Sequence, residues 1–395
     1  MTWNWQRPEW PEFSWNPVLL RRAEEQFLVG GGMFAGIFAH LASDDKDQLV
    51  IEALSTEALT TSEIEGEMLD RASVQSSIRR QLGLTADPRR VKPAEQGVAE
   101  MTVNLYRSFD EPLTDDMLFN WYRMLMNGRR DIRNIGGYRT HKEPMQIVSG
   151  AVYEPKVHFE APPSADVPRE MRRFAKWFNR TAPDGASPLP ALTRAGIAHL
   201  YFECIHPFED GNGRIGRAVA EKALAQGLAH PPLMALAMTI LAKRKAYYEA
   251  LERNNTEIEL TEWLGWFAGV SIEAQRRTTA LIEFLLDKTK LLDRLSGELN
   301  GRQQKALLRV LREGPEGFRG GLSAGNYATI TGASAPTATR DLADLVAKGA
   351  LIRSGERRYA RYRANVELRP VKAVAIDGKG RIVECSSALA GSPSR

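Results

Sequence analysis

A segment of twelve residues, 206–217, brings together residue types that suit phosphate chemistry. His206 carries an imidazole, the side chain whose ordinary pKa lies closest to neutrality, as a general base requires. Asp210 offers the hard carboxylate oxygen that Mg²⁺ prefers as a ligand. Gly211 and Gly213 allow the backbone to come close to phosphate oxygens. These residue types predict the transfer of a phosphoryl or nucleotidyl group.

The elements on either side must position this segment, and both are predicted to be helices. Apolar residues fill 191–205, and helix-like sequence runs from 214 to 226. A loop that opens onto a helix N-terminus presents free N–H groups and the positive end of the helix dipole to an anion. Arg214 and Arg217 are three residues apart, so they share a helix face and can bind one polyphosphate. The alternative, a glycine-rich helix start with incidental charges, does not account for twelve such positions.

The segment resembles the signature of the Fic family, His-Pro-Phe-x-Asp/Glu-Gly-Asn-Gly/Lys-Arg-x-x-Arg, at every defining position. The resemblance implies a mainly α-helical enzyme that transfers AMP from ATP to a Ser, Thr or Tyr hydroxyl of a protein. It implies that His206 deprotonates the acceptor hydroxyl and that Asp210 holds Mg²⁺. It assigns the phosphate contacts to Gly211, Asn212, Gly213, Arg214 and Arg217. Transfer to its own chain and removal of AMP remain open alternatives.

Position 213 bears on the direction of transfer. Family members with Lys at this place include the Doc toxins, a kinase-like branch that binds the nucleotide in the reverse sense. Gly213 therefore favours AMP transfer over phosphorylation.

A second motif lies upstream. The run from Thr61 to Gly66, with Glu65 before the glycine, resembles the family's inhibitory pattern Ser/Thr-x-x-x-Glu-Gly/Asn. Thr61 and Glu65 are four residues apart on one helix face, and apolar spacing over 49–59 predicts a helix there. The resemblance implies that Glu65 pairs with Arg217 and hinders productive ATP binding. The alternative is an ordinary solvated acidic helix, and three neighbouring residues are interpreted as examples of one: Glu57, Glu63 and Glu67.

A hairpin is predicted before the catalytic segment, at 145–157. β-Branched residues flank Ser149-Gly150, which indicates a turn at that pair. The resemblance implies a flap that holds the target segment by strand addition, and the alternative is a hairpin with no ligand.

An adenine pocket is predicted after the catalytic segment. Residues 243–254 resemble the Tyr-rich segment that lines this pocket in the family, with Tyr247 and Tyr248 as the stacking face and Asn254 or Asn255 as a polar contact. Core tyrosines on a helix are an equal alternative.

The C-terminal part has a different character. Helices are predicted at 302–312, 322–332 and 335–349, followed by a basic hairpin at 351–363. This order resembles a winged helix, a fold that commonly binds DNA. Between 302 and 366, twelve Lys and Arg stand against five Asp and Glu, a local charge of +7 when the whole chain carries only +4. The residues expected to face a DNA groove are Ser334, Thr337, Thr339 and Arg340. A packing or dimerisation module is the alternative.

The predicted fold class is mainly α, a Fic-type helical bundle with a β-hairpin flap plus a C-terminal winged-helix (α+β) domain. We predict a Trp-rich N-terminal module at 1–40, an inhibitory helix region at 41–85, the catalytic core at 86–285, a winged-helix domain at 286–370 and a loosely ordered tail at 371–395.

Composition sets the frame. A chain of 395 residues, 43% hydrophobic and 26% charged, is typical of a globular protein of two or three domains. No apolar run approaches the ~20 residues that span a bilayer, and the polar start does not resemble a signal peptide, so no membrane partner is expected. Two cysteines support no disulfide framework, Cys204 is expected to be a buried thiol, and a cytoplasmic location is expected. Homodimer formation is expected from the resemblance. Two functions remain: an inhibited AMP transferase, or a DNA-binding regulator that senses nucleotide.

Overall fold

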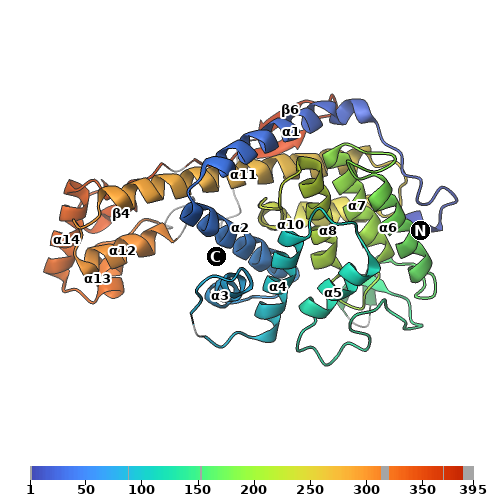
Figure 1. The fold of residues 1–395 in the computed structure, drawn as a ribbon, viewed down its shortest axis with the longest axis horizontal. Helices are drawn as coiled ribbons and strands as arrows, with labels where there is room; N and C mark the ends of the chain where they lie inside the picture. The colour runs from blue at the N-terminus through green and yellow to red at the C-terminus, as the bar shows by residue number, and fades with distance from the viewer. Residues whose placement is uncertain (1, 88, 152–153, 313–319, 368, 386–395) are drawn as a thin grey trace. The chain divides into compact units, whose positions relative to one another are not determined.

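The structure is a computed structural model that describes residues 2–87, 89–151, 154–312, 320–367 and 369–385 (Figure 1). Most described residues are helical, and the strands form three two-stranded antiparallel sheets. The predicted mainly α fold with small hairpins is confirmed. Among the described residues, no helix combines the length and the hydropathy needed to span a membrane.

The chain forms two compact units, one of residues 1–40, 50–276 and 372–395 and one of residues 41–49 and 277–371. One unit limit falls at 40/41, where the sequence also predicted a boundary, whereas the limits at 49/50 and 276/277 do not correspond to the predicted boundaries at 85/86 and 285/286. Two continuous helices, α2 (Ser43–Ile64) and α11 (Thr261–Arg294), run through the unit limits. A change of unit inside one helix leaves no turn residue or change of composition for a sequence reading to find.

The other regular elements of the first unit are η1 (Asn4–Gln6), α1 (Pro17–His40), α3 (Arg71–Gln81), α4 (Pro93–Arg107), α5 (Asp115–Leu125), β1 (Gln146–Ala151), β2 (Glu154–Glu160), α6 (Val167–Arg180), α7 (Ala191–Ile205), α8 (Asn212–Leu228), α9 (Leu236–Ala242), α10 (Arg244–Asn254), β5 (Ala373–Ile376) and β6 (Ile382–Cys385). Helices α7 and α8 pack along each other at its centre. Every residue of α7 is buried, as expected for a helix that is apolar on all sides. Cys204 lies in α7, is buried as predicted, and has its pKa raised to about 12 by that burial.

The N-terminal helix α1 and the Trp-rich arm before it fix the start of α7. Glu24 of α1 accepts hydrogen bonds from the backbone N–H groups of Leu192 and Thr193, at 2.9 and 2.7 Å. A carboxylate at this place satisfies N–H groups that have no partner inside the helix. In the arm, the buried Trp10 ring packs edge-on against Tyr201 of α7. The arm and α1 thus hold the helix that ends at His206.

The predicted hairpin is present, but its turn lies elsewhere. Strand β1 pairs with β2 so that Ser149 lies opposite Lys156 and Gly150 opposite Pro155. Ser149 and Gly150 therefore belong to strand β1 and not to a turn, and residues 152–153 lie outside the described residues. The β-branched residues before the pair continue into it as one extended run, so the glycine does not mark the turn.

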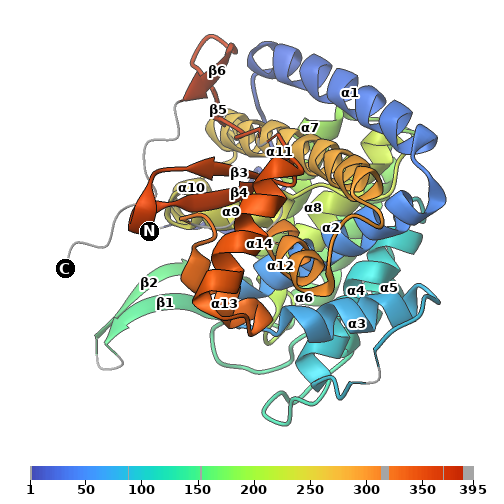
Figure 2. The ribbon, with the colours of Figure 1, turned by 90° about the vertical axis from the view of Figure 1, so that its left-hand side faces the viewer.

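The second unit contains the three predicted helices and the predicted hairpin. Figure 2 shows α12 (Gly301–Leu311), α13 (Ala324–Thr331) and α14 (Ala335–Ala347) grouped around β3 (Leu351–Ser354) and β4 (Arg361–Ala364). A short 3₁₀ helix, η3 (Arg357–Tyr359), connects the two strands. Asn300 and Ser323 each cap the helix that follows, in capping boxes with Gln303 and Asn326.

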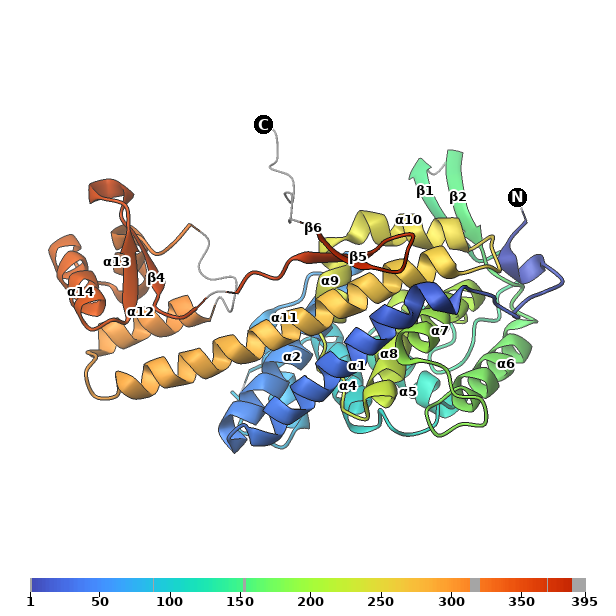
Figure 3. The same cartoon turned by 90° about the horizontal axis from the view of Figure 1, so that it is seen from above.

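The segment after 371 contains a regular hairpin within residues 373–385, where a loosely ordered tail was predicted. Strands β5 and β6 form a hairpin beside the first part of α11 (Figure 3). Val374 is buried, and its N–H donates to Glu273 of α11 at 3.1 Å. The sequence carried a signal for this hairpin in Asp377-Gly378, a turn pair between apolar runs. Residues 386–395 lie outside the described residues.

Candidate active site

The charged segment forms a loop between the two central helices. Helix α7 ends at Ile205, and His206 follows with a left-handed backbone, φ 50°. Helix α8 begins at Asn212, so the N–H groups of its first turn open onto the loop. The predicted arrangement of helix, loop and helix N-terminus is confirmed.

The loop is held from inside by three side chains. The Asn212 amide bonds both backbone groups of Phe208, accepting at 2.9 Å and donating at 2.8 Å. The Phe208 ring is buried and stacks on Tyr122 at 4.3 Å between ring centroids. Arg139, also buried, donates from Nε to the carbonyl of His206 at 2.8 Å. Because the Asn212 side chain is held by Phe208, we expect the backbone N–H of Asn212 to be the group that contacts an anion.

Arg139 also ties the predicted flap to this loop. Its backbone N–H donates to the carbonyl of Pro207 at 2.9 Å, and its guanidinium donates to the carbonyl of Pro162. Residue 139 precedes β1 by seven residues, and residue 162 follows β2 by two. Arg139 therefore connects the segments on both sides of the hairpin to the loop that carries His206 and Pro207.

His206 is held in its neutral form. Burial, and next to it the positive charge of Arg139, lowers the pKa of His206 to about 4. Glu203, whose Oε2 lies 3.9 Å from His206 Nδ1, is also buried, and burial raises the pKa of its carboxyl to about 8. At neutral pH the imidazole of His206 is therefore uncharged and has a lone pair that can accept a proton, as a general base requires. The neighbouring Glu203 carboxyl keeps its proton at this pH.

A titration tests this environment. We expect the His206 ring in the free protein to titrate near pH 4, because burial disfavours its charged form. Since the unfolded chain takes up this proton first, the folded state should lose stability as the pH falls from 6.5 towards 4. NMR of the imidazole signals, with His206 assigned by its loss in His206→Ala, measures the midpoint. A midpoint near 6.5 would contradict the burial argument.

Arg217 is bound by the predicted inhibitory motif. Its side chain is 1% exposed, and Nη2 pairs with Glu65 Oε1 at 2.7 Å. Nε donates to the Thr61 hydroxyl at 2.8 Å, and Nη2 donates to the Thr61 carbonyl at 2.9 Å. The two motifs that the sequence singled out, 152 residues apart, thus meet in one network.

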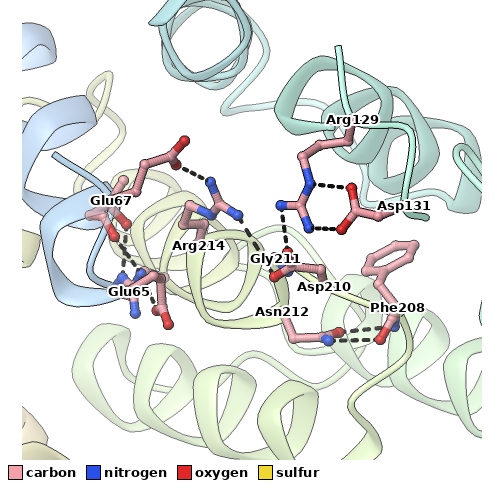
Figure 4. A network of polar contacts seen from close by, with 11 residues as sticks. Glu65, Glu67, Arg129, Asp131, Phe208, Asp210, Gly211, Asn212 and Arg214 are labelled. Atoms are coloured by element: carbon pink, nitrogen blue, oxygen red, sulfur yellow. Dashed lines mark hydrogen bonds and ion pairs between the residues drawn. The ribbon is translucent and has the colours of Figure 1, made fainter. Parts of the chain in front are cut away.

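Arg214 is bound in the same way by a residue that was interpreted as solvated. Glu67 Oε2 lies 2.8 Å from Arg214 Nη1, and the Arg214 side chain is 8% exposed (Figure 4). Gly66 separates the two acids and has φ +84°, a turn that ends α2 and brings both carboxylates to α8. The interpretation of Glu67 as an ordinary surface acid is wrong, because its partner lies far away in the sequence.

Glu57 is not solvated either. It is buried in α2, its Oε1 accepts from the Ala237 N–H at 2.7 Å, and it shares a hydrogen bond with the carboxyl of Glu221 on α8. Burial raises the pKa of both carboxyls, so the pair retains a proton where exposed acids have lost theirs. This acid pair attaches α2 to α8 one turn beyond Arg217.

The docked position of Glu65 also explains the glycine at 213. A Cβ atom built on Gly213 would lie 2.3 Å from Glu65 Oε1 and 3.1 Å from Arg217 Nη1. Any side chain at 213 would therefore displace the carboxylate from Arg217.

Asp210 is the one predicted metal ligand. Its Oδ1 accepts from the Gly211 N–H at 2.5 Å, and its Oδ2 pairs with Arg129 Nη1 at 2.9 Å. Among the described residues, no group of three metal-ligating side chains occurs. A single, 41% exposed carboxylate at a helix N-terminus fits a Mg²⁺ ion whose other ligands are phosphate oxygens and water.

The predicted adenine-pocket residues separate into two kinds. Tyr247 is 1% exposed, and its hydroxyl bonds His199 Nε2 at 2.9 Å, so its ring lies in the core. Asn254 is buried and donates to the Ala250 carbonyl of its own helix. Tyr248 is 41% exposed, and its hydroxyl donates to the Ile64 carbonyl at the end of α2 at 3.3 Å. Of the three, only Tyr248 offers an exposed ring.

Sequence reasoning missed Arg129, Arg139, Glu203 and Glu67 as residues of this site. Glu203 is three residues before His206 on the same helix, so helical spacing could have indicated it. The others come from loops or from α2's end, and no local pattern marks them.

Comparisons with known proteins agree with this site. Residues 112–224 match the sequence model of the Fic/DOC family, and residues 3–84 match a domain of unknown function, DUF4172. A probable protein adenylyltransferase of Aquifex aeolicus is 28% identical over 129 residues, 33% of this chain and 35% of that protein. The protein adenylyltransferase Fic of Drosophila melanogaster is 33% identical over 96 residues, 24% of this chain and 18% of that protein.

The chain thus spans about a third or less of the relatives that it matches by sequence. Among solved structures, a Fic family protein from Desulfovibrio desulfuricans aligns over 87% of this chain and 95% of its own, with 21% identity and a TM-score of 0.49.

Proposed function

We propose that this chain, which carries a Fic/DOC domain at residues 112–224, transfers AMP from ATP to a hydroxyl group of a protein. One observation carries the proposal: a neutral histidine whose side chain is only 12% exposed follows α7 and lies beside a helix N-terminus that bears two buried arginines. Such an arrangement can accept a proton and hold a polyphosphate at the same place. The names of the sequence relatives support the same activity.

The proposed roles follow the geometry. The acceptor hydroxyl gives its proton to His206 and its oxygen bonds the α-phosphorus, while the bond to the departing pyrophosphate breaks. The N–H groups of Asn212 and Gly213 and the guanidinium groups of α8 would stabilise the phosphate charge, and the N–H of Gly211 would join them once it leaves Asp210 Oδ1. Asp210 would hold Mg²⁺, which when bound supplies neutralising charge to the phosphates.

The proposal includes an inhibited state. Both α8 arginines already have carboxylate partners from the end of α2, Glu65 on Arg217 and Glu67 on Arg214. A nucleotide that needs these guanidinium groups must displace the two carboxylates. We propose that Glu65 is the stronger of the two, because Arg217 is 1% exposed and its pair is therefore less screened by solvent.

The β1–β2 hairpin is the proposed site for the target segment. Its side chains include the exposed apolar residues Ile147, Val148 and Val157. An edge strand of this kind can add a strand from another protein through main-chain hydrogen bonds, which accept varied sequences.

The activity is tested with two labelled forms of ATP. The full chain and its Glu65→Gly variant are incubated with Mg²⁺ and a defined mixture of purified proteins, with ATP labelled on the α- or the γ-phosphate. Protein-bound label from the α-position alone supports AMP transfer. Label from the γ-position would indicate phosphorylation, and no label in either variant would contradict the proposal.

A second candidate function is DNA binding by the second unit. Exposed arginines lie in α14, at Arg340, and in the β3–β4 hairpin, at Arg353 and Arg363. Ser334 and Thr339 are exposed near the start of α14, and Thr337 is half-buried there. This distribution favours contacts to phosphates, with nucleotide sensing by the Fic/DOC domain as the regulatory input.

We expect a labelled DNA duplex to bind with a Kd of roughly 10⁻⁴–10⁻⁶ M and to weaken as salt rises. Each single substitution of Arg340, Arg353 or Arg363 by alanine should reduce the slope of the logarithm of the binding constant against the logarithm of the salt concentration by about 1. Fluorescence anisotropy at several salt concentrations measures both. Absence of binding at low salt, with self-association in ultracentrifugation, would instead support a dimerisation module.

A further inference from the structure

Arg129 lies between two carboxylates at the mouth of the catalytic loop. Its Nη1 pairs with Asp210 Oδ2 at 2.9 Å, while Nε and Nη2 bond the two oxygens of Asp131 at 2.8 and 2.6 Å (Figure 4). We propose that Arg129 competes with the divalent cation for Asp210, and that Asp131 holds Arg129 when the cation binds. The inference rests on the proposed function only in assigning a cation to Asp210.

The competition concerns one particular oxygen. Asp210 Oδ1 is directed to the Gly211 N–H at 2.5 Å and lies 3.8 Å from Arg214 Nη2. Oδ2, the oxygen without these neighbours, is the one that Arg129 occupies. A Mg²⁺ ion binds a carboxylate oxygen at about 2.1 Å, and a guanidinium nitrogen at hydrogen-bond distance from the same oxygen would repel it. The two cations therefore exclude each other at Oδ2.

The geometry makes the exchange easy. Arg129 makes a single contact to Asp210 but a two-point contact to Asp131, and a two-point pair is the better defined of the two. Arg129 and Asp210 are each 41% exposed, and ion pairs this exposed are weak. Loss of the Nη1 contact alone releases Asp210, and the guanidinium can stay on Asp131.

The backbone keeps Arg129 close while this happens. Glu209, the residue before Asp210, accepts hydrogen bonds from the N–H groups of Arg133 and Asn134 at 3.2 and 3.1 Å. The loop that carries Arg129 and Asp131 is thereby attached to the catalytic loop itself. Arg129 can return to Asp210 without any movement of a larger element.

Every charged group assigned to the nucleotide then has an internal competitor. Glu65 occupies Arg217, Glu67 occupies Arg214, and Arg129 occupies Asp210. The first two oppose the phosphates, and the third opposes the metal. Arg129 is therefore a positioning residue that sets the cation concentration at which the site fills.

The test measures Mn²⁺ binding, read from the free-ion EPR signal, to the full chain with and without a non-hydrolysable ATP analogue. Arg129→Gln is expected to bind Mn²⁺ about three- to tenfold more tightly than the parent, because Oδ2 is released and a nearby positive charge is removed. Arg130→Gln, the same charge change at an exposed neighbouring residue, is the matched control and should change affinity less than twofold. Asp210→Asn identifies the signal that belongs to this site.

Asp131→Asn separates the two parts of the inference. Alone it should weaken Mn²⁺ binding, since Arg129 then has only Asp210 as a partner. In the Arg129→Gln background, Asp131→Asn should change the logarithm of the Mn²⁺ affinity by less than half as much as it does in the parent. Such a reduced effect is what a double-mutant cycle shows when one residue acts through the other. Equal affinities for Arg129→Gln and Arg130→Gln, or an undiminished Asp131 effect, would overturn the inference, whether or not AMP transfer is observed.

Discussion

Glu65→Gly is expected to raise the transfer of label from α-labelled ATP to protein by about 10- to 100-fold, which lies within the range of typical coupling free energies between two interacting sites of a protein. In the structure Arg217 is buried, and its Nη2 donates hydrogen bonds to Glu65 Oε1 and to the Thr61 carbonyl. Removal of the carboxylate releases the guanidinium for the proposed phosphate contact and also clears the space beside Gly213. Gel-based measurement of protein-bound label gives the rate.

Two matched substitutions show whether the carboxylate itself is responsible. Glu65→Gln keeps the size of the side chain and should also activate, whereas Glu63→Gln makes the same change two residues earlier, in the last turn of α2, and should not. The partners found for Arg214 and Arg217 are Thr61, Glu65, Glu67 and Asp210, so Glu63 serves as the control. Equal rates of AMP transfer in the parent and in both Glu65 variants would contradict the hypothesis that Glu65 inhibits the enzyme.

The mechanism of activation is distinguishable by nucleotide binding. If Glu65 acts on Arg217, calorimetry should show tighter ATP binding in Glu65→Gly, because the guanidinium no longer has to leave a carboxylate. Glu67→Gln should tighten binding by a smaller factor, since Glu67 is 36% exposed and its pair is better screened. A larger effect at Glu67 than at Glu65 would reverse the proposed order of the two contacts.

His206→Ala is expected to lower AMP transfer by about 10²- to 10⁴-fold, the usual contribution of a general base. The histidine is neutral at pH 7 because burial and Arg139 lower its pKa, so it can accept the proton of the acceptor hydroxyl. Its ring carries no part of the contacts that hold the loop, which come from Asn212, Phe208 and the carbonyl of His206. ATP binding should therefore survive the substitution.

The loss is measured in the Glu65→Gly background, where the signal is largest. His141→Ala, at a histidine whose Nδ1 contacts only the nearby Glu143 carbonyl among the contacts found, serves as a control and should keep the activity. Unchanged transfer in His206→Ala would refute the assignment of the base. Loss of both transfer and ATP binding would instead assign His206 a structural role.

The sequence alone predicted the parts of this site that depend on near neighbours. Helix α7 has the predicted bounds, and α8 differs from its predicted bounds by two residues at each end. Both predictions succeeded because the pattern of apolar residues that indicates a helix is contained within the segment itself. His206 and Asp210 occupy one loop for the same reason. The pairing of Glu65 with Arg217 was also predicted, but through resemblance to a family rather than through spacing.

Only the tertiary structure decided the remaining contacts. Glu67 and Arg129 lie in polar segments of the sequence and would be expected at the surface, but they pair with Arg214 and Asp210, which come from distant parts of the chain. Tyr247 lies in the core although its pattern suited a pocket equally well. Helical and strand periods determine which face a residue occupies, whereas the packing of separate elements determines what that face meets. For this protein, the sequence therefore specified the loop between α7 and α8, and the packing of α2 and the 129–134 loop against it specified which charged groups pair there.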